Sequence, residues 1–420
     1  MSKRQLATLV FLVALAVRLL YVFTVPYGPL ETDAKDYDTL GLRVAQGKGL
    51  VTASGELTAN RPPVYPLFLG AIYWAVGHDL TWVRTVQAVL SAYTCVLTYL
   101  IAAILFDSLV AALSGLFCAL YLPFIVGSGA ILTETLFIFL CLAFIVLIIH
   151  RQDSFSTVIA GAVFGVALLT RPVALFFLPF VLYWLTTSRK EFTLSLIVTF
   201  LTGLLLIITP WTIRNYLQLE SFVPLTNLGG LALYNSYVVP QQGLGYNSLE
   251  SLDREYFDIK NETGRNRYLI RKTFDYVYQN PMRVIRFMFV KLALLIYPFD
   301  GYWYPVSFGS RYNIFWGITL CFGAASLCIN LKSFDGRQKL ILYLLLSFVI
   351  ASMCFYGSPR FRLPAEPFLI CLAAHGTVVL YKRSRVAFLS ILLVNLLLFL
   401  VFRYLSFQSV FSYCNGLMRS

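Results

Sequence analysis

Residues 6–25, LATLVFLVALAVRLLYVFTV, form an apolar run in which Arg18 is the one charged residue, and the acidic stretch 31–38, ETDAKDYD, follows closely. An α-helix needs about 20 residues to cross roughly 30 Å of hydrocarbon. Runs of similar length recur to the end of the chain, and backbone groups in lipid must find their hydrogen bonds within their own segment. The sequence therefore predicts an all-α polytopic membrane protein.

The composition agrees with a membrane protein and excludes an ordinary soluble domain. Hydrophobic residues make up 59% of the chain and charged residues 13%, with a mean hydropathy of +0.74; soluble chains are roughly one quarter charged. The net charge is +13, but the Lys and Arg residues cluster in short turns between apolar runs, as cytoplasmic loops facing anionic lipids do. Membrane lipids, not nucleic acid, are the expected partners. The cysteines lie mostly within apolar runs and show no disulfide or zinc spacing.

The charge pattern predicts the topology. The basic turns at 150–151, 188–190, 332–339 and 382–385 all fall on one side if the spans alternate from a cytoplasmic N-terminus. We expect about eleven transmembrane helices in a single membrane domain, 1–420, with outer-face juxtamembrane helices, in the cytoplasmic (inner) membrane of a cell. The expected spans lie at 6–25, 82–106, 109–125, 134–149, two around 170–172, 192–211, 314–329, 340–355, 364–380 and 386–404.

Two polar regions are expected on the outer face. The first, 26–80, contains the acidic stretch, a short surface helix at 36–45, and a stiff turn made by Pro62, Pro63 and Pro66. The second, 212–311, is polar from 235 to 279. Within it, 282–297 alternates basic and apolar residues, which favours an interfacial helix and leaves a short, tilted span as the alternative.

Carboxylates at the outer face are candidates for chemistry. Asp33, with Glu31 and Asp36 nearby, can supply a general base or contribute to a divalent-cation site. Tyr37 lies four residues after Asp33 and would share its helix face. Glu134 follows Thr133 at the start of a span, where a helix cap explains it structurally; the functional alternative is a second carboxylate opposite Asp33.

Arginines gather at the same level. Arg171 and Arg214 sit at outer span ends, and Arg360 and Arg362 lie on the outside, where the insertion bias disfavours positive charge. Arginine suits bidentate phosphate contact, so an anionic ligand explains this placement better than topology does. Together the groups suit a lipid-linked, phosphate-bearing substrate with its tail between helices.

The order and spacing of several short motifs resemble the bacterial polyprenol-phosphate-sugar-dependent glycosyltransferases of the GT-C fold, whose relatives include the protein O-mannosyltransferases and the lipid A aminoarabinose transferase. The motifs are Asp33-Ala34 with Tyr37, GKG at 47–49, RPPVYP at 61–66, TETL at 133–136, LTRP at 169–172, PWTIRN at 210–215 and RFRLP at 360–364.

The resemblance implies inverting transfer of a hexosyl or pentosyl group from a polyprenyl-phosphate-linked sugar donor to a lipid, glycan or protein acceptor. Asp33 would be the base, and arginines, Arg61 among them, would bind the phosphate. The chain departs from the mannosyltransferases because Ala34 replaces the Glu of their Asp-Glu pair. Whether Glu31, Asp36 or Glu134 supplies a second acid, and whether a divalent cation is bound, stays open.

Two other functions compete with this interpretation. A transporter or flippase of lipid-linked saccharides would show inverted repeats and charges near mid-membrane, and neither is evident in the sequence. A polymerase or ligase acting on longer saccharides is the other alternative. Convergence of the acidic and arginine sites at one outer cavity would favour an enzyme.

Overall fold

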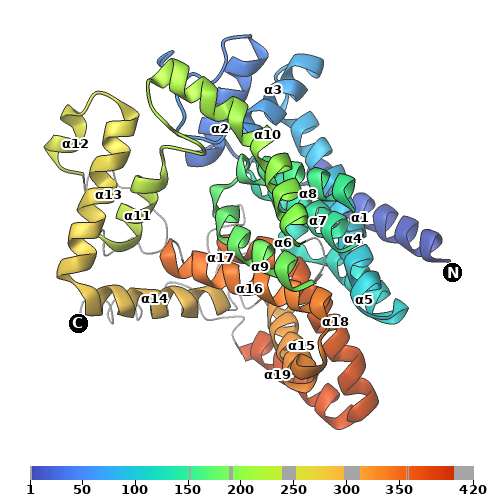
Figure 1. The fold of residues 1–420 in the computed structure, drawn as a ribbon. Helices are drawn as coiled ribbons and strands as arrows, with labels where there is room; N and C mark the ends of the chain where they lie inside the picture. The colour runs from blue at the N-terminus through green and yellow to red at the C-terminus, as the bar shows by residue number, and fades with distance from the viewer. Residues whose placement is uncertain are drawn as a thin grey trace.

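The computed structural model describes residues 2–150, 153–188, 193–238, 252–297, 313–355, 357 and 359–401. The helices of the first half are α1 (Lys3–Thr24), α2 (Thr32–Ala45), α3 (Val64–Val76), α4 (Leu80–Leu105), α5 (Ser108–Leu120), α6 (Leu122–Gly129), α7 (Glu134–His150), α8 (Ser154–Leu168), the 3-10 helix η1 (Pro172–Phe177), α9 (Leu178–Ser188) and α10 (Thr193–Leu219). Figure 1 shows α1, α4, α5, α7 and α8 grouped as one bundle.

The second half adds a group of peripheral helices and a second bundle layer. Its elements are α11 (Gly229–Tyr237), α12 (Arg254–Asp258), α13 (Glu262–Gln279), α14 (Pro281–Ile296), α15 (Ile314–Asn330), η3 (Leu331–Ser333), α16 (Gly336–Cys354), α17 (Pro359–Arg362), η4 (Leu363–Ala365), α18 (Glu366–Arg383) and α19 (Arg385–Val401). In Figure 1, α11–α14 stand apart from the bundle on one side, and α15, α18 and α19 extend below it.

The described residues form a multi-pass membrane protein. Six of their helices are long and apolar enough to cross a membrane, or seven if α5 and α6, bent by 46°, make one span; five more apolar helices are shorter. The predicted all-α class is confirmed, and the count of eleven spans stays a prediction. The core joins α1, α4, α7, α8 and α18 through side chains such as Val10, Phe137, Phe144, Phe164 and Phe368.

The bundle has two chemically different ends. At one end the Tyr99 hydroxyl donates to the Lys3 carbonyl (3.3 Å), and the Gln338 amide donates to the Leu105 carbonyl (2.9 Å). The start of α1, the end of α4 and the start of α16 therefore meet there. Glu134 and Arg360 begin α7 and the α17–α18 segment at the opposite end, next to α2. The acidic and basic candidates thus share one end of the bundle.

The helices of the two polar regions, 26–80 and 212–311, differ in part from the expectation. The predicted surface helix at 36–45 is α2, but it begins at Thr32, so most of the acidic stretch is helical. The predicted helix at 282–297 is α14. Helices α11, α12 and α13 were not expected. For α12 and α13 the reason is that 235–279 is too polar to signal helices by hydrophobic periodicity, and α11 has only nine residues. The basic residues at 151 and 189–190 and parts of the region 212–311 lie outside the described residues.

Arg18 is a buried structural residue. It is fully shielded from solvent, and it donates to the Ser91 hydroxyl (2.7 Å) and to the carbonyls of Ala14 (3.0 Å) and Ala119 (2.9 Å). Among the described residues its partners include no carboxylate. Its hydrogen-bond donors find partners inside the bundle, on α1, α4 and α5. Arg18 therefore fits a structural role in holding these helices together better than contact with a ligand.

The α8–α10 contact depends on glycine. A Cβ added at Gly203 would overlap the backbone of Val158, and one at Gly161 would overlap the backbone of Phe200. Small residues of this kind let membrane helices approach closely. We expect Gly203→Ala to destabilise the protein by about 1–3 kcal/mol through overpacking, measured as a lower apparent Tm in detergent at a fixed scan rate. Gly336→Ala, where the added Cβ meets open space, is the control; an equal Tm for both variants would contradict the prediction.

Candidate active site

Asp33 is placed by the first turn of α2. The preceding residue, Thr32, has φ +45°, a left-handed conformation that costs a β-branched residue about 1–3 kcal/mol. Such strain persists only where the surroundings enforce it, and here it directly precedes the candidate base. Asp33 and Asp36 lie three residues apart, so both carboxylates occupy one face of α2.

Arg61 joins those two carboxylates. Its Nη2 donates to Asp33 Oδ1 (2.7 Å) and to Asp36 Oδ2 (2.9 Å). The guanidinium carbon lies 5.0 Å from the centre of the Tyr37 ring, which is buried and packs edge-on against Tyr65. Tyr37 therefore forms an aromatic floor under Arg61, a cation–π arrangement that fixes the position of the charge.

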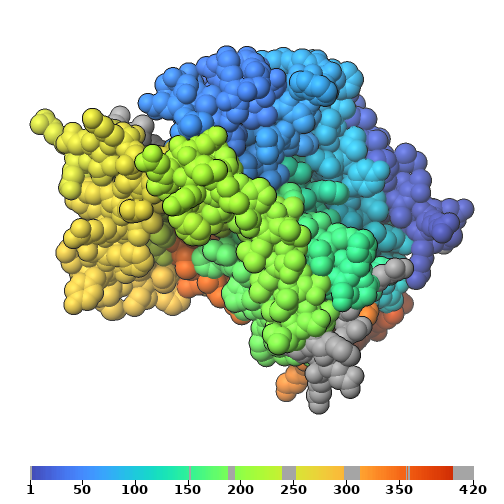
Figure 2. All heavy atoms as spheres, turned by 45° about the horizontal axis from the view of Figure 1, so that its top comes forward, coloured from blue at the N-terminus to red at the C-terminus, as the bar shows by residue number. Residues whose placement is uncertain are grey.

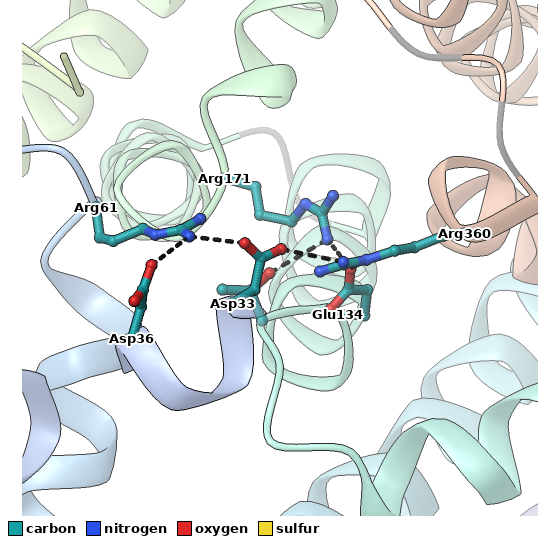
Figure 3. Close-up of polar contacts among 7 residues, drawn as sticks. Asp33, Asp36, Arg61, Glu134, Arg171 and Arg360 are labelled. Carbon is teal, nitrogen blue, oxygen red and sulfur yellow. Dashed lines mark hydrogen bonds and ion pairs between the residues drawn. The ribbon is translucent and has the colours of Figure 1, made fainter. Parts of the chain in front are cut away.

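Arg360 bridges the two candidate acids (Figure 3). Its Nη1 donates to Asp33 Oδ2 (3.1 Å), and its Nε donates to Glu134 Oε1 (2.5 Å). Arg171 donates to the same Glu134 oxygen and to the Thr133 hydroxyl (3.2 Å). We call Asp33, Asp36, Glu134, Arg61, Arg171 and Arg360 the ion cluster.

The ion cluster brings together five segments that are distant in sequence: the start of α2, the turn before α3, the start of α7, the turn between α8 and η1, and α17. It holds three carboxylates and three guanidinium groups, so its formal charge is balanced. The two acids differ in access, since the Asp33 side chain is 31% exposed and that of Glu134 only 3%. Glu134 Oε2 is buried without a hydrogen-bond partner among the described residues.

The pKa of Asp33 reflects two opposing effects. Burial would raise the pKa of this carboxyl, but the positive charges of Arg61 and Arg360, with their hydrogen bonds, outweigh burial and hold the pKa below its ordinary value. Asp33 is therefore ionised at neutral pH. It is also a weak base as long as both arginines contact it.

Apart from Tyr37, which packs under Arg61, three predicted site residues lie outside the ion cluster. Glu31 precedes α2 and makes no side-chain cap hydrogen bond. Arg214 donates to the carbonyls of Thr58 (3.0 Å) and Leu50 (3.3 Å). Arg362 turns away from Arg360: it donates to Glu366 (2.8 Å) and to the Tyr297 carbonyl (2.5 Å). A substrate role for these three residues stays a prediction.

Sequence reasoning missed two polar residues behind the ion cluster. Glu262 at the start of α13 contacts the loop that carries Arg61. Lys291 on α14 is 1% exposed and donates to Ser236 (2.6 Å). Lys291 is the one charged residue in the apolar second half of α14, and this placement was a usable signal. Nothing in the sequence distinguished Glu262 from its polar neighbours.

The described residues do not fit a resident divalent cation. They contain no group of three or more His, Cys, Asp or Glu side chains that could hold one. Both oxygens of Asp33 accept from arginines, and so does Glu134 Oε1. The carboxylates of this site are therefore balanced by guanidinium groups.

Comparison with solved structures identifies proteins of similar fold. The chain is similar to the archaeal oligosaccharyltransferase AglB from Archaeoglobus fulgidus in complex with an inhibitory peptide and a dolichol-phosphate, with 13% identity, coverage of 91% of this chain and 51% of AglB, and a TM-score of 0.57. The apo form gives 13% identity, 96% and 55% coverage, and a TM-score of 0.56. ArnT from Cupriavidus metallidurans bound to undecaprenyl phosphate shows 15% identity, coverage of 90% of this chain and 78% of the ArnT chain, and a TM-score of 0.45.

The chain is thus a membrane protein of the GT-C fold, as the sequence resemblance predicted. It spans about half the length of the AglB chain that it matches. Residues 60–213 match the family model described as dolichyl-phosphate-mannose-protein mannosyltransferase, a segment that includes Arg61, Glu134 and Arg171. A comparison with curated protein sequences found no match.

Proposed function

We propose that this protein is a membrane glycosyltransferase, which moves a sugar from a polyprenyl-phosphate donor to a lipid, glycan or protein acceptor with inversion of the anomeric centre. The observation that carries the proposal is the bridge made by Arg360 between Asp33 and Glu134. An arginine shared by an accessible and a buried carboxylate provides a phosphate-binding cation next to a candidate base. The GT-C fold and the family match over 60–213 support the same reaction class.

In the structure Arg61 and Arg360 are paired with Asp33, so both arginines must exchange this carboxylate for the donor phosphate before reaction. A donor phosphate is a better bidentate partner for Arg61 and Arg360 than a single carboxylate oxygen. When these arginines turn to the phosphate, Asp33 loses the charges that lower its pKa and becomes a stronger base. Donor binding therefore activates Asp33.

The transfer step then follows from the released carboxylate. Asp33 takes the proton of the acceptor hydroxyl, whose oxygen attacks the anomeric carbon from the face opposite the phosphate. The carbon–oxygen bond to phosphate breaks, and its electron pair leaves with the polyprenyl phosphate. Arg61 and Arg360 stabilise the charge that develops on this leaving group. Holding both reactants in line supplies much of the remaining rate enhancement.

Charge placement supports an outer, non-cytoplasmic location for this site. Lys3 and Arg4 begin α1, Lys332 lies in the turn before α16, and Lys382 and Arg383 end α18. These elements begin or end at the end of the bundle opposite the ion cluster. Since basic residues favour the cytoplasmic side, the ion cluster would face outward.

The test is a transfer assay with the purified protein in liposomes. Polyprenyl-phosphate sugars, each labelled in the sugar, are supplied in the outer leaflet, and both label in the acceptor fraction and free polyprenyl phosphate are measured. Equal amounts of the two products are expected. Movement of intact donor across the bilayer with no free polyprenyl phosphate would instead identify a transporter and overturn the proposal.

The pH dependence gives a second prediction. Arg61→Gln removes one charge that lowers the Asp33 pKa, so the acidic limb of kcat/KM is expected to move to higher pH. The lost charge-assisted hydrogen bonds should also reduce kcat/KM by about 10- to 100-fold at neutral pH. Arg43→Gln is the control. Arg43 also lies on α2, but it donates to the Ala53 carbonyl (3.2 Å), and the charges that lower the Asp33 pKa are those of Arg61 and Arg360. An unchanged acidic limb in Arg61→Gln would contradict the role of Arg61.

A further inference from the structure

The outer helices α11 and α13 contact both segments that carry arginines to Asp33. We define the α11–α13 unit as residues 226–237 and 261–279. In Figure 1, α11 lies between α13 and the part of the bundle near α17, and Figure 2 shows the unit's side of the molecule beside α10 and the α2–α3 region. We propose that this unit positions Arg61 and Arg360 together, with Glu262 as the positioning residue for Arg61; this rests on the proposed function.

One end of the unit holds the loop before Arg61. The Glu262 carboxylate accepts from the Thr58 hydroxyl (2.8 Å), from the Ala59 amide (2.7 Å) and from the Asn227 side chain (2.9 Å). The backbone N–H of Asn227 donates in turn to the Ala59 carbonyl (3.0 Å). Both backbone groups of Ala59 therefore bond to the unit, two residues before Arg61.

Further bonds fix the same loop. The Thr226 hydroxyl donates to the Asn60 carbonyl (2.6 Å), and Arg214 of α10 donates to the Thr58 carbonyl (3.0 Å). Three consecutive residues thus present backbone groups to the second outer region. Arg61 is the next residue, and the rest of its path is set by Pro62 and Pro63. A shift of the unit would consequently move Arg61 relative to Asp33.

The other end of the unit holds the segment before Arg360. The Tyr237 hydroxyl donates to the Met353 carbonyl (2.8 Å), and the Ser236 hydroxyl donates to the Phe355 carbonyl. Lys291 donates to Ser236 (2.6 Å) and lies 3.6 Å from the centre of the Tyr237 ring. These contacts fix the end of α16, a few residues before Arg360.

The two ends are joined rigidly through α11. The Gly230 amide donates to the Asn266 side chain of α13 (2.6 Å), and a Cβ added at Gly230 would overlap the Asn266 backbone. α11 is a single helix of nine residues from Gly229 to Tyr237. Displacement of α11 from α13 would therefore disturb both arginine-bearing segments. This makes the α11–α13 unit a positioning element for the ion cluster.

Adjacent glycines supply a matched pair of variants. Gly230→Ala forces α11 away from Asn266, whereas an added Cβ at Gly229 meets nothing within 4 Å. Hydrogen exchange of the full chain in lipid nanodiscs reports each segment without any substrate. In Gly230→Ala we expect exchange at 58–61 and at 353–355 to rise about tenfold or more through local opening, with Gly229→Ala like the wild type. Unchanged exchange at either segment overturns the proposal.

A double-mutant cycle tests whether Glu262 acts through Arg61. Glu262→Ala is expected to lower kcat/KM about tenfold in the wild type and less than about twofold when Arg61 is already Gln, because coupled residues are not additive. Glu262→Gln keeps an acceptor for the Ala59 amide and should restore most of the rate. Equal losses in both backgrounds would overturn the positioning role. If the wild type transfers no sugar, the exchange experiment still decides the proposal, so the two failures are distinguishable.

Discussion

Asp33→Asn is expected to fold normally and to lose sugar transfer by about a thousandfold, within the range that a general base contributes. An amide cannot accept the acceptor's proton at neutral pH. In the wild type, Arg61 donates to Asp33 Oδ1 (2.7 Å), and the carbonyl oxygen of the introduced amide can still accept this hydrogen bond. The measurement is single-turnover transfer from a labelled polyprenyl-phosphate sugar, with wild type and variant at matched amounts in liposomes.

Asp36→Asn is the matched control for this prediction. Asp36 accepts from the same Arg61 atom at 2.9 Å, lies on the same helix and is 61% exposed. Exposed pairs of this kind contribute about 0–1 kcal/mol, so this variant should keep its fold and most of its activity. If Asp33→Asn and Asp36→Asn retain similar activity, Asp33 is not the base. A large fall in the apparent Tm of Asp33→Asn would likewise remove the argument, since inactivity would then follow from unfolding.

The sequence allows the all-α membrane class and the acidic and basic candidate residues to be predicted, because apolar runs, prolines and charge bias are local signals. Helix α2 and helix α14 are both recognisable from their spacing. The pairing inside the ion cluster is not, since Arg360 meets Asp33 across 327 residues. No local signal says which arginine meets which carboxylate.

Arg360 and Arg362 illustrate why neighbours in sequence can differ in role. Both follow Pro359 and both are expected on the outer side against the insertion bias, so the sequence treats them alike. In the structure they belong to one short helical turn, α17, and residues two apart on a helix do not share a face. Arg360 reaches Asp33 and Glu134, whereas Arg362 pairs with Glu366 and lies over Trp316. Helix α13 was missed for a different reason, because its sequence is too polar to signal a helix by hydrophobic periodicity, and its contact with α11 joins segments distant in sequence.

Glu134→Gln is expected to reduce stability where Asp33→Asn does not. The Glu134 side chain is 3% exposed and faces Arg171 and Arg360, whose side chains are 12% and 23% exposed. Loss of the buried negative charge removes the carboxylate partner of Arg171 and leaves Arg360 paired with Asp33 alone. Breaking a buried ion pair in this way typically costs about 3–5 kcal/mol. The apparent Tm should fall clearly, and transfer should fall with it because Arg360 loses one of the two carboxylates that orient it.

Glu134→Gln combined with Arg171→Gln separates this anchoring role from a role as base. Removing Arg171 as well restores the charge balance around Arg360, so the double variant should recover much of the lost Tm, as expected for directly coupled residues. Activity should recover in part, since Asp33 is untouched. The opposite pattern, in which Glu134→Gln folds normally but is inactive while Asp33→Asn remains active, would make Glu134 the base. That outcome requires a buried carboxylate to meet the acceptor, and hence an opening of Arg360 away from Glu134 that hydrogen exchange at 359–362 would detect.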